Sequence, residues 1–261
     1  MILVVDVGNT NIVFAIYEKY NLINTWRVST HPQKTADELY VILNILLTKE
    51  NINFTMIQGA ILSSVVPNVI DSLVKMIQEL IGIIPIVVDD SIYHKLNIGY
   101  NTTQVGSDRI VNTIAAHEKY RKASIIVDFG TATTFTAITK EGKYLGGTIC
   151  AGINTCSDAL CEKTAKLPKI KLEKPNTIIC NNSVNAMQAG IIYGHIGLVD
   201  YIITKIKEEM SKTDLLVIAT GGLSTFIGSD CLQINKVEPN LTLDGLNIIY
   251  NKLVLFDSNK D

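Results

Sequence analysis

Residues 2–17 read ILVVDVGNTNIVFAIY, and residues 124–139 read SIIVDFGTATTFTAIT. Each stretch is an apolar run that ends in an acidic residue, turns at a glycine and returns as a second β-rich run, which is the pattern of a hairpin. A repeat separated by about half of the chain is too long for a solenoid period and indicates duplication of a whole domain. At one constant offset the two stretches align Asp6 with Asp128, Gly8 with Gly130, Asn11 with Thr133, and Ala15-Ile16 with Ala137-Ile138.

The rest of the chain alternates between helix and strand patterns. Thr35-Ala-Asp-Glu38 predicts a capping box at the start of a helix, and a long apolar stripe predicts another helix from Ser183 onward. Short apolar runs at residues 61–66, 86–88 and 215–219 predict buried strands. Such alternation indicates an α/β fold with mixed sheets flanked by helices. We expect one domain over residues 1–118 and a second over residues 119–261.

The composition is that of a globular protein, with 47% hydrophobic and 18% charged residues among 261. Lys and Arg (23) nearly balance Asp and Glu (25), so we expect no polybasic surface for nucleic acid or anionic lipid. The first residues lack the basic start of a signal peptide, and no apolar run reads as long enough to span a bilayer. The five cysteines and four histidines follow neither disulfide-framework nor zinc-site spacing, which favours a cytoplasmic protein with reduced thiols.

The first hairpin carries a polar turn after an apolar strand, from Asp6 to Asn11. Backbone N–H groups in a glycine-containing turn form a concave surface suited to nucleotide phosphates. Asp6 could hold a hydrated Mg²⁺, because Mg²⁺ takes few carboxylates and keeps several waters. The alternative is an ordinary Asn-rich turn. The second copy favours phosphate binding, since turn formation does not require an acidic residue after the strand in both halves.

The second hairpin is richer in hydroxyl groups. Thr131, Thr133 and Thr134 can donate to phosphate oxygens, and Asp128 can neutralise a nearby cation. Alternating threonines are also typical of strands. We therefore predict phosphate contact for Thr131 alone, because it lies in the turn.

A third candidate is Gly106-Ser-Asp-Arg109, which precedes the buried stripe of a helix. Ser107 and Asp108 could be simple capping or first-turn residues. They could also be catalytic, because an Asp can accept a proton from a substrate hydroxyl while an Arg and the helix N-terminus hold an anionic group. Gly221-Gly222, after a predicted strand, could let a flat ligand such as adenine approach the backbone, or could be only a turn.

In order and spacing, these motifs resemble the type III pantothenate kinases, a bacterial family of the actin, hexokinase and Hsp70 superfamily. The resemblance covers nearly the whole chain and implies duplicated actin-like (ribonuclease H-like) domains, the second with helices that form a homodimer. It rests on residues 6–11, Trp26-Arg27, residues 35–38, Ser63-Ser-Val-Val-Pro67, residues 106–109 and 127–134, Gly146-Gly147, Leu167-Pro168, Met187-Gln-Ala-Gly190 and Thr220-Gly-Gly222.

The resemblance also implies roles for single residues. Asp108 would be the general base, and Asp128 the ligand of a monovalent cation, K⁺ or NH₄⁺. ATP, with Mg²⁺, would bind along Asp6, Val7, Gly8, Asn9, Thr10, Asn11, Ile12 and Val13, with help from Thr131. Pantothenate would contact Tyr100, Gly106, Ser107, Asp108, Arg109 and Ser183.

Three residues depart from the family pattern: Ser107 stands where Ala is usual, Ser183 where Thr is usual, and Asn185 where Glu is common. The implied activity is phosphorylation of pantothenate by ATP, the first step of coenzyme A synthesis. Two alternatives remain open on the same fold. One is a kinase for another small hydroxy compound, because folds do not fix substrates. The other is a regulatory nucleotide-binding protein without catalysis, against which Asp108 and Arg109 count.

Overall fold

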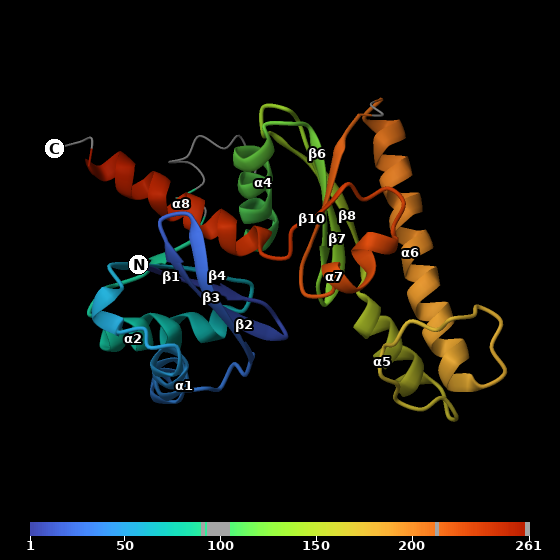
Figure 1. Cartoon of the computed structure of the whole chain (residues 1–261), viewed down its shortest axis with the longest axis horizontal. Helices are drawn as coiled ribbons and strands as arrows, with labels where there is room; N and C mark the ends of the chain where they lie inside the picture. The colour runs from blue at the N-terminus through green and yellow to red at the C-terminus, as the bar shows by residue number, and fades with distance from the viewer. Residues whose placement is uncertain (90–91, 93–104, 212–213, 259–261) are drawn as a thin grey trace. The chain divides into compact units, whose positions relative to one another are not determined.

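The structure, a computed structural model, describes residues 1–89, 92, 105–211 and 214–258. The chain divides into two compact units (Figure 1). Unit 1 comprises Met1–Ala115 and Thr242–Asp261, and unit 2 comprises Ala116–Leu241. The first passage from unit 1 to unit 2 lies near the predicted boundary at residues 118 and 119, whereas the return of the C-terminal helix to unit 1 was not part of that prediction.

Unit 1 is built on a mixed five-stranded sheet in the order β3-β2-β1-β4-β5. The central strand β1 pairs antiparallel with β2 and parallel with β4, and β4 pairs parallel with β5. The strands are β1 (Ile2–Val7), β2 (Asn11–Glu18), β3 (Asn21–Ser29), β4 (Gly59–Ser64) and β5 (Ile86–Val87). The helices are α1 (Ala36–Lys49), α2 (Ile70–Ile81), α8 (Leu241–Ser258) and the first part of α4 (Ser107–Tyr120), which continues into unit 2 after Ala115. There are 3-10 turns at Phe54–Met56 and Pro67–Val69.

Helices cover both faces of the unit 1 sheet. Because side chains alternate between the two faces of a strand, successive residues of β1 pack in two different cores. Leu3, Val5 and Val7 pack with α1 and α2, whereas Ile2 and Val4 pack with α4 and α8. The predicted capping box starts α1: the N–H of Glu38 donates to Thr35 Oγ1, and the N–H of Thr35 donates to Glu38 Oε2.

Unit 2 repeats the mixed five-stranded sheet, in the order β10-β9-β6-β7-β8. The central strand β6 pairs antiparallel with β7 and parallel with β9, so both hairpins occupy the same place in their sheets. Its strands are β6 (Ser124–Phe129), β7 (Ala132–Ile138), β8 (Tyr144–Ala151), β9 (Leu216–Thr220) and β10 (Lys236–Val237). Its helices are α5 (Ile153–Lys163), α6 (Ser183–Glu209) and α7 (Ser224–Ile227), with a 3-10 turn at Gly228–Asp230. The predicted α/β fold with mixed sheets is confirmed.

The residue-by-residue alignment of the two hairpins is wrong along the returning strand. In hairpin 1 the last pair before the turn is Val7 with Ile12, but in hairpin 2 it is Phe129 with Thr133. The turn of hairpin 2 is therefore one residue shorter, and Thr133 occupies the place of Ile12, not that of Asn11. Since side chains alternate between faces, this shift turns Thr133 into the core, where it is 1% exposed.

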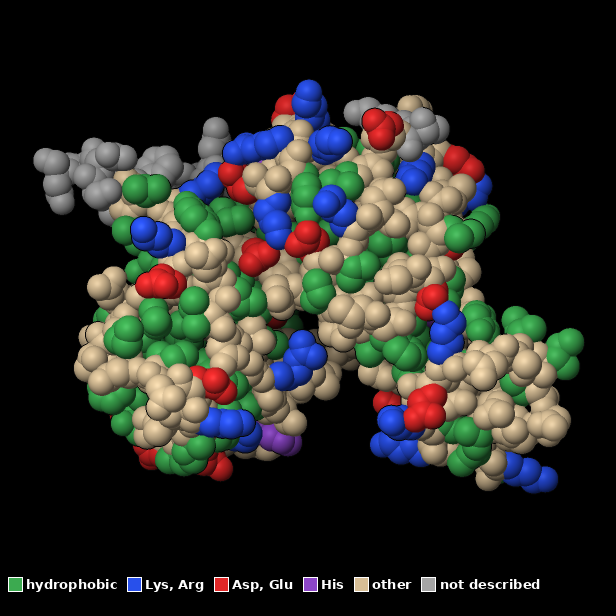
Figure 2. All heavy atoms as spheres, in the orientation of Figure 1, with side chains coloured by type: hydrophobic (Ala, Val, Ile, Leu, Met, Phe, Trp, Pro, Cys, Tyr) green, Lys and Arg blue, Asp and Glu red, His purple; other side chains and the backbone are tan. Residues whose placement is uncertain are grey.

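Helix α6 has the length and apolarity of a membrane-spanning segment, which corrects the expectation that no run was long enough. Length and composition are weak indications, because core helices of soluble proteins pass the same test. Here Met187, Ile191, Val199 and Ile203 of α6 pack against the unit 2 sheet. Over the face in view, acidic and basic side chains are interspersed, in keeping with their balanced numbers (Figure 2).

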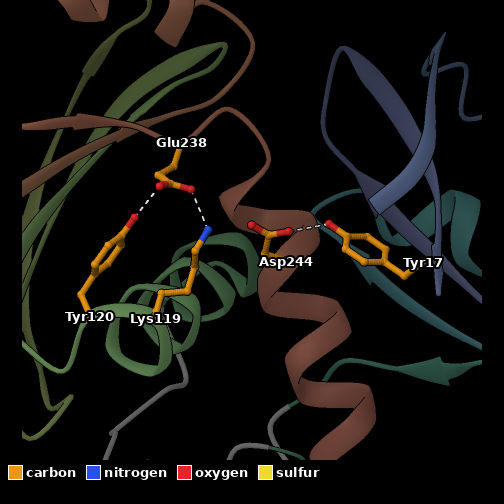
Figure 3. Close-up of polar contacts among 5 residues, drawn as sticks. All are labelled: Tyr17, Lys119, Tyr120, Glu238 and Asp244. Carbon is orange, nitrogen blue, oxygen red and sulfur yellow. Dashed lines mark hydrogen bonds and ion pairs between the residues drawn. The ribbon is translucent and has the colours of Figure 1, made fainter. Parts of the chain in front are cut away.

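Polar side chains bond the chain on both sides of the point where it passes from unit 2 back to unit 1, at Glu238 and at Asp244 (Figure 3). Within unit 2, Lys119 Nζ donates to Glu238 Oε2 at 2.6 Å, and the Tyr120 hydroxyl donates to the other oxygen of the same carboxylate. Within unit 1, the buried Tyr17 hydroxyl donates to Asp244 Oδ1 of α8 at 2.7 Å. Thus α8 is fixed to β2 by a directed bond as well as by apolar contacts.

Replacing Tyr17 with Phe removes the hydroxyl and leaves the ring. Because the acceptor is a carboxylate, we expect the free energy of unfolding to fall by about 1.5–3 kcal/mol, measured by urea denaturation. Tyr20→Phe is the matched control, since Tyr20 is 68% exposed and its replacement should change nothing. Unchanged stability of Tyr17→Phe would mean that this hydrogen bond does not contribute to holding α8.

Candidate active site

Hairpin 1 presents a braced polar turn. The N–H of Gly8 donates to the carbonyl of Asn11 at 2.9 Å, and Thr30 donates its hydroxyl to the carbonyl of Gly8 at 2.7 Å and its N–H to the carbonyl of Thr10 at 2.9 Å. Asn9 and Thr10 are exposed at the tip. Val7 and Ile12 are buried in the core, so any contact they make with a ligand is through the backbone.

A pair of serines joins β4, the strand that pairs with β1 of hairpin 1, to the start of α4. Asp6 pairs in register with Ser63 of β4, so both side chains lie on the face that α4 covers. The Ser63 hydroxyl donates to Ser107 Oγ at 3.0 Å, and the Ser107 hydroxyl donates to the carbonyl of Ser64 at 3.3 Å. No role was predicted for Ser63 from the sequence, although two serines at the end of a buried apolar strand can indicate a functional position.

Asp108 is held in the first turn of α4. Burial raises the pKa of its carboxyl group, and the N–H of Arg109, 2.8 Å from Oδ1, offsets part of that rise. A carboxylate with a raised pKa is a better proton acceptor than an ordinary Asp. Gly106 makes room for it, because a Cβ at residue 106 would lie 2.5 Å from Asp108 Oδ1.

A pocket of about 410 Å³ opens at this end of α4, within the size range of small-molecule sites. Gly106 and Ser107 form the helix end of the pocket, so the partial positive charge of the helix N-terminus acts on its contents. The lining residues are Ser64, Val65, Val88, Asp89, Val105, Gly106 and Ser107.

Hairpin 2 is anchored from the side by α5. The carbonyl of Thr131 accepts from the N–H of Gly152 at 3.0 Å and from the Thr155 hydroxyl at 2.7 Å. These bonds fix the turn while the Thr131 side chain stays exposed. Thr133, by contrast, is buried and bonded to His195, so its hydroxyl contacts the core, as the strand interpretation expected.

Oxygen-bearing side chains form a row across unit 2 at the end of β6. Asp128 pairs in register with Thr134 of β7 and with Thr220 of β9, so the three side chains share one face. Thr220 is fully buried, and its Oγ1 has no hydrogen-bond partner among the described residues. A buried hydroxyl is rarely left unpaired. A carboxylate flanked by hydroxyls suits a hard cation.

Gly221 closes the β9 turn over Asp128. Its φ is +89°, and a Cβ there would lie 2.3 Å from Asp128 Oδ1 and 2.8 Å from the backbone N of Phe129. A glycine is therefore required at residue 221 by both conformation and space. From the sequence, Gly221-Gly222 could admit a flat ligand or could be only a turn; the structure shows a turn whose Gly221 lies close to Asp128.

The family model for type III pantothenate kinase matches residues 2–205. The chain belongs to this family. Members are kinases, which implies that this protein uses ATP, a small-molecule substrate and a divalent metal such as Mg²⁺ carried by ATP.

Solved structures with the same fold are actin- and hexokinase-like ATPases. A Baf family protein from Campylobacter jejuni matches with a TM-score of 0.59 and 16% identity, over 97% of this chain and 98% of that one. The activator of 2-hydroxyisocaproyl-CoA dehydratase from Clostridium difficile, with bound ADPNP, has a TM-score of 0.56 and 11% identity over 99% and 96%. ROK hexokinase from Thermus thermophilus has a TM-score of 0.53 and 10% identity over 97% and 99%. At such identities the likeness shows the fold alone.

The residues that the resemblance to type III pantothenate kinases singled out are distributed over both units. Residues 6–13 and 106–109 lie in unit 1 and are brought together there through Ser63. Asp128, Thr131 and Ser183 lie in unit 2, with Ser183 exposed in the first turn of α6 after the N-cap Asn182. Tyr100 lies outside the described residues.

Replacing Gly106 with Ala tests the space that Asp108 needs. The new methyl group would meet Asp108 Oδ1, so we expect the carboxylate to move and kcat for phosphoryl transfer to fall about tenfold or more, because catalysis is sensitive to small misplacements. Steady-state kinetics checks this, together with ATP-binding calorimetry, which should show little change. A kcat equal to that of the unmodified protein would show that the carboxylate position is not critical.

Proposed function

We propose that this protein transfers the γ-phosphate of ATP to the primary hydroxyl of pantothenate, which yields 4′-phosphopantothenate and begins coenzyme A synthesis. The observation that carries the proposal is the placement of Asp108. Its carboxylate lies at the N-terminus of α4 and has a raised pKa, and the preceding Ser107 bonds Ser63 on the strand beside Asp6. Family membership over residues 2–205 supports pantothenate as the acceptor.

In the proposed reaction, the pocket at the start of α4 holds pantothenate. Pantothenate carries a carboxylate at one end and a primary hydroxyl at the other, so it needs both an anion site and a base. Arg109, the N-terminus of α4, Tyr100 and Ser183 would bind and orient it. Asp108 would then accept the proton of the attacking hydroxyl as the oxygen bonds to the γ-phosphorus and the bond to ADP breaks.

The two hairpins would hold the nucleotide. The braced turn of residues 8–11 and the exposed Thr131 would contact the phosphates, and Asp6 would orient the Mg²⁺ that ATP carries. The row of Asp128, Thr134 and Thr220 fits a monovalent cation such as K⁺ or NH₄⁺, because all three offer oxygens and the Thr220 hydroxyl has no partner in the described part of the chain. Bound there, the cation would reduce negative charge near the phosphates.

The proposed cellular location and oligomeric state are those that the family resemblance implies. We propose a cytoplasmic homodimer, formed through helices of the second predicted domain. Ser107, where the family usually has Ala, is compatible with the site because its hydroxyl finds partners in Ser63 and the carbonyl of Ser64.

A coupled assay for ADP release tests the proposal directly. ADP formation should depend on both pantothenate and K⁺ or NH₄⁺, with mass spectrometry identifying 4′-phosphopantothenate. Asp128→Asn should raise the K⁺ concentration for half-maximal rate about tenfold, because a charged ligand becomes neutral. The matched control Asp158→Asn, on an exposed carboxyl of α5, should leave it unchanged. Full activity in Na⁺ alone would refute the Asp128 site, and ATP turnover only with another hydroxy compound would refute the substrate.

Replacing Asp108 with Asn tests the base. We expect kcat to fall by about 10² or more while the Kd for ATP stays nearly constant. In the unmodified protein, kcat/KM should fall on acidification with an inflection above the ordinary Asp value of about 3.9, since burial raises the pKa. Near-normal turnover of Asp108→Asn would exclude the base role, and Asp71→Asn, on an exposed carboxyl of α2, is the control.

The same variant has a stability readout with a defined sign. A raised folded-state pKa means that the ionised carboxylate is disfavoured in the folded protein. This cost is present above the folded-state pKa and vanishes below the unfolded-state pKa. Asp108→Asn should therefore melt at or above the unmodified protein's temperature at pH 7, and the gain should shrink on acidification.

A further inference from the structure

His195 is a buried titratable side chain that the proposed reaction does not use. It lies on α6, is 5% exposed, and its Nε2 is 2.9 Å from the hydroxyl oxygen of Thr133. Its ring also faces Phe129, with the centroids 6.3 Å apart and the planes tilted by 54°. Burial lowers the pKa of His195, so the ring is neutral at pH 7 and has one donor and one acceptor nitrogen.

The two residues that His195 touches close the base of hairpin 2. Phe129 and Thr133 form the last pair of the β6–β7 ladder, and only Gly130, Thr131 and Ala132 lie between them. The position of this pair therefore sets where the turn stands. On the side of the turn, α5 holds the carbonyl of Thr131 through Gly152 and Thr155.

Hairpin 1 shows that the fold does not need a polar contact at this place. By register, Ile12 is the counterpart of Thr133, and Phe14 is the counterpart of Phe135. Ile12 is fully buried among apolar side chains of α1 and α2. Packing alone could thus be satisfied by an apolar pair in unit 2. Apolar contacts are not directional, whereas a hydrogen bond fixes distance and angle.

We propose that His195 is a positioning residue whose hydrogen bond to Thr133 fixes the β6–β7 turn against α6 for binding nucleotide phosphates. The inference rests on the proposed function, because it takes hairpin 2 to be a phosphate-binding element. A turn held in its bound position loses less freedom when the ligand arrives, which strengthens binding. His195 then acts on ATP affinity without touching ATP.

Two substitutions at Thr133 separate the hydrogen bond from packing. Thr133→Val keeps the volume and removes the hydroxyl, whereas Thr133→Ser keeps the hydroxyl and loses a methyl group. We expect Thr133→Val to raise the Kd of a non-hydrolysable ATP analogue about tenfold, the equivalent of one neutral hydrogen bond. Thr133→Ser should keep the original Kd although its melting temperature falls. Calorimetry with Mg²⁺ and K⁺ present measures the Kd.

Variants at His195 give the reciprocal test. His195→Leu should raise the Kd and the KM for ATP about as much as Thr133→Val, with the KM for pantothenate unchanged, and His195→Gln should restore part of the affinity. The double variant Thr133→Val/His195→Leu should regain melting temperature, because no buried polar group is left unpaired, but it should not regain affinity. Thr204→Val is the control, since the Thr204 hydroxyl bonds only the carbonyl of Asp200 within α6 among its described contacts.

The outcomes separate this inference from the proposed function. The inference is supported if only the variants that lose the Thr133–His195 hydrogen bond bind the ATP analogue more weakly. It is overturned if the affinity for the analogue changes in parallel with the melting temperature, or is the same in all variants. If the unmodified protein binds the ATP analogue but does not phosphorylate pantothenate, the proposal of pantothenate as substrate fails. The Kd measurements then still decide whether His195 is a positioning residue. If the unmodified protein binds no nucleotide, both proposals fall.

Discussion

A carboxylate near the end of the central strand of each sheet is the constraint on which the rest of the site depends. Asp6 lies on β1 and Asp128 on β6, and each strand is hydrogen-bonded on both sides and covered by a core. A strand held in this way places its side chains rigidly, so the acidic group and the following turn need no ordering when a ligand binds. The neighbours of Asp6 in register are Val13 and Ser63, whereas those of Asp128 are Thr134 and Thr220.

Much of this arrangement follows from the sequence, because it depends on local patterns. Apolar runs that end in Asp, a glycine turn and a capping box each predict structure from a few consecutive residues, and the hairpins, α1 and α6 form where these patterns stand. The family resemblance also selected Asp108, whose raised pKa depends on burial that no short motif reveals. The roles of the site residues themselves stay predictions.

Other features depend on contacts between distant segments or on backbone register, and the sequence did not reveal them. The return of α8 to unit 1 is held by long-range contacts such as the bond between Tyr17 and Asp244, and by apolar packing against β1 and α4. The bond between Ser63 and Ser107 likewise joins two residues that are 44 positions apart in the chain. The one-residue difference between the turns is invisible to a constant-offset alignment, because both versions preserve the glycine and the alternation of apolar residues.

That one-residue difference explains how the two halves can share a backbone frame and differ in chemistry. Shortening the turn brings Thr133 to the core position that Ile12 fills in unit 1, and a core hydroxyl requires a partner, which α6 supplies through His195. The same shortening sets Thr134 beside Asp128, where hairpin 1 has Val13 beside Asp6. Asp128 is therefore flanked by two hydroxyl-bearing residues, whereas Asp6 is flanked by one, Ser63. This difference supports the proposal that the two acidic residues serve different ions, a divalent metal at Asp6 and a monovalent cation at Asp128.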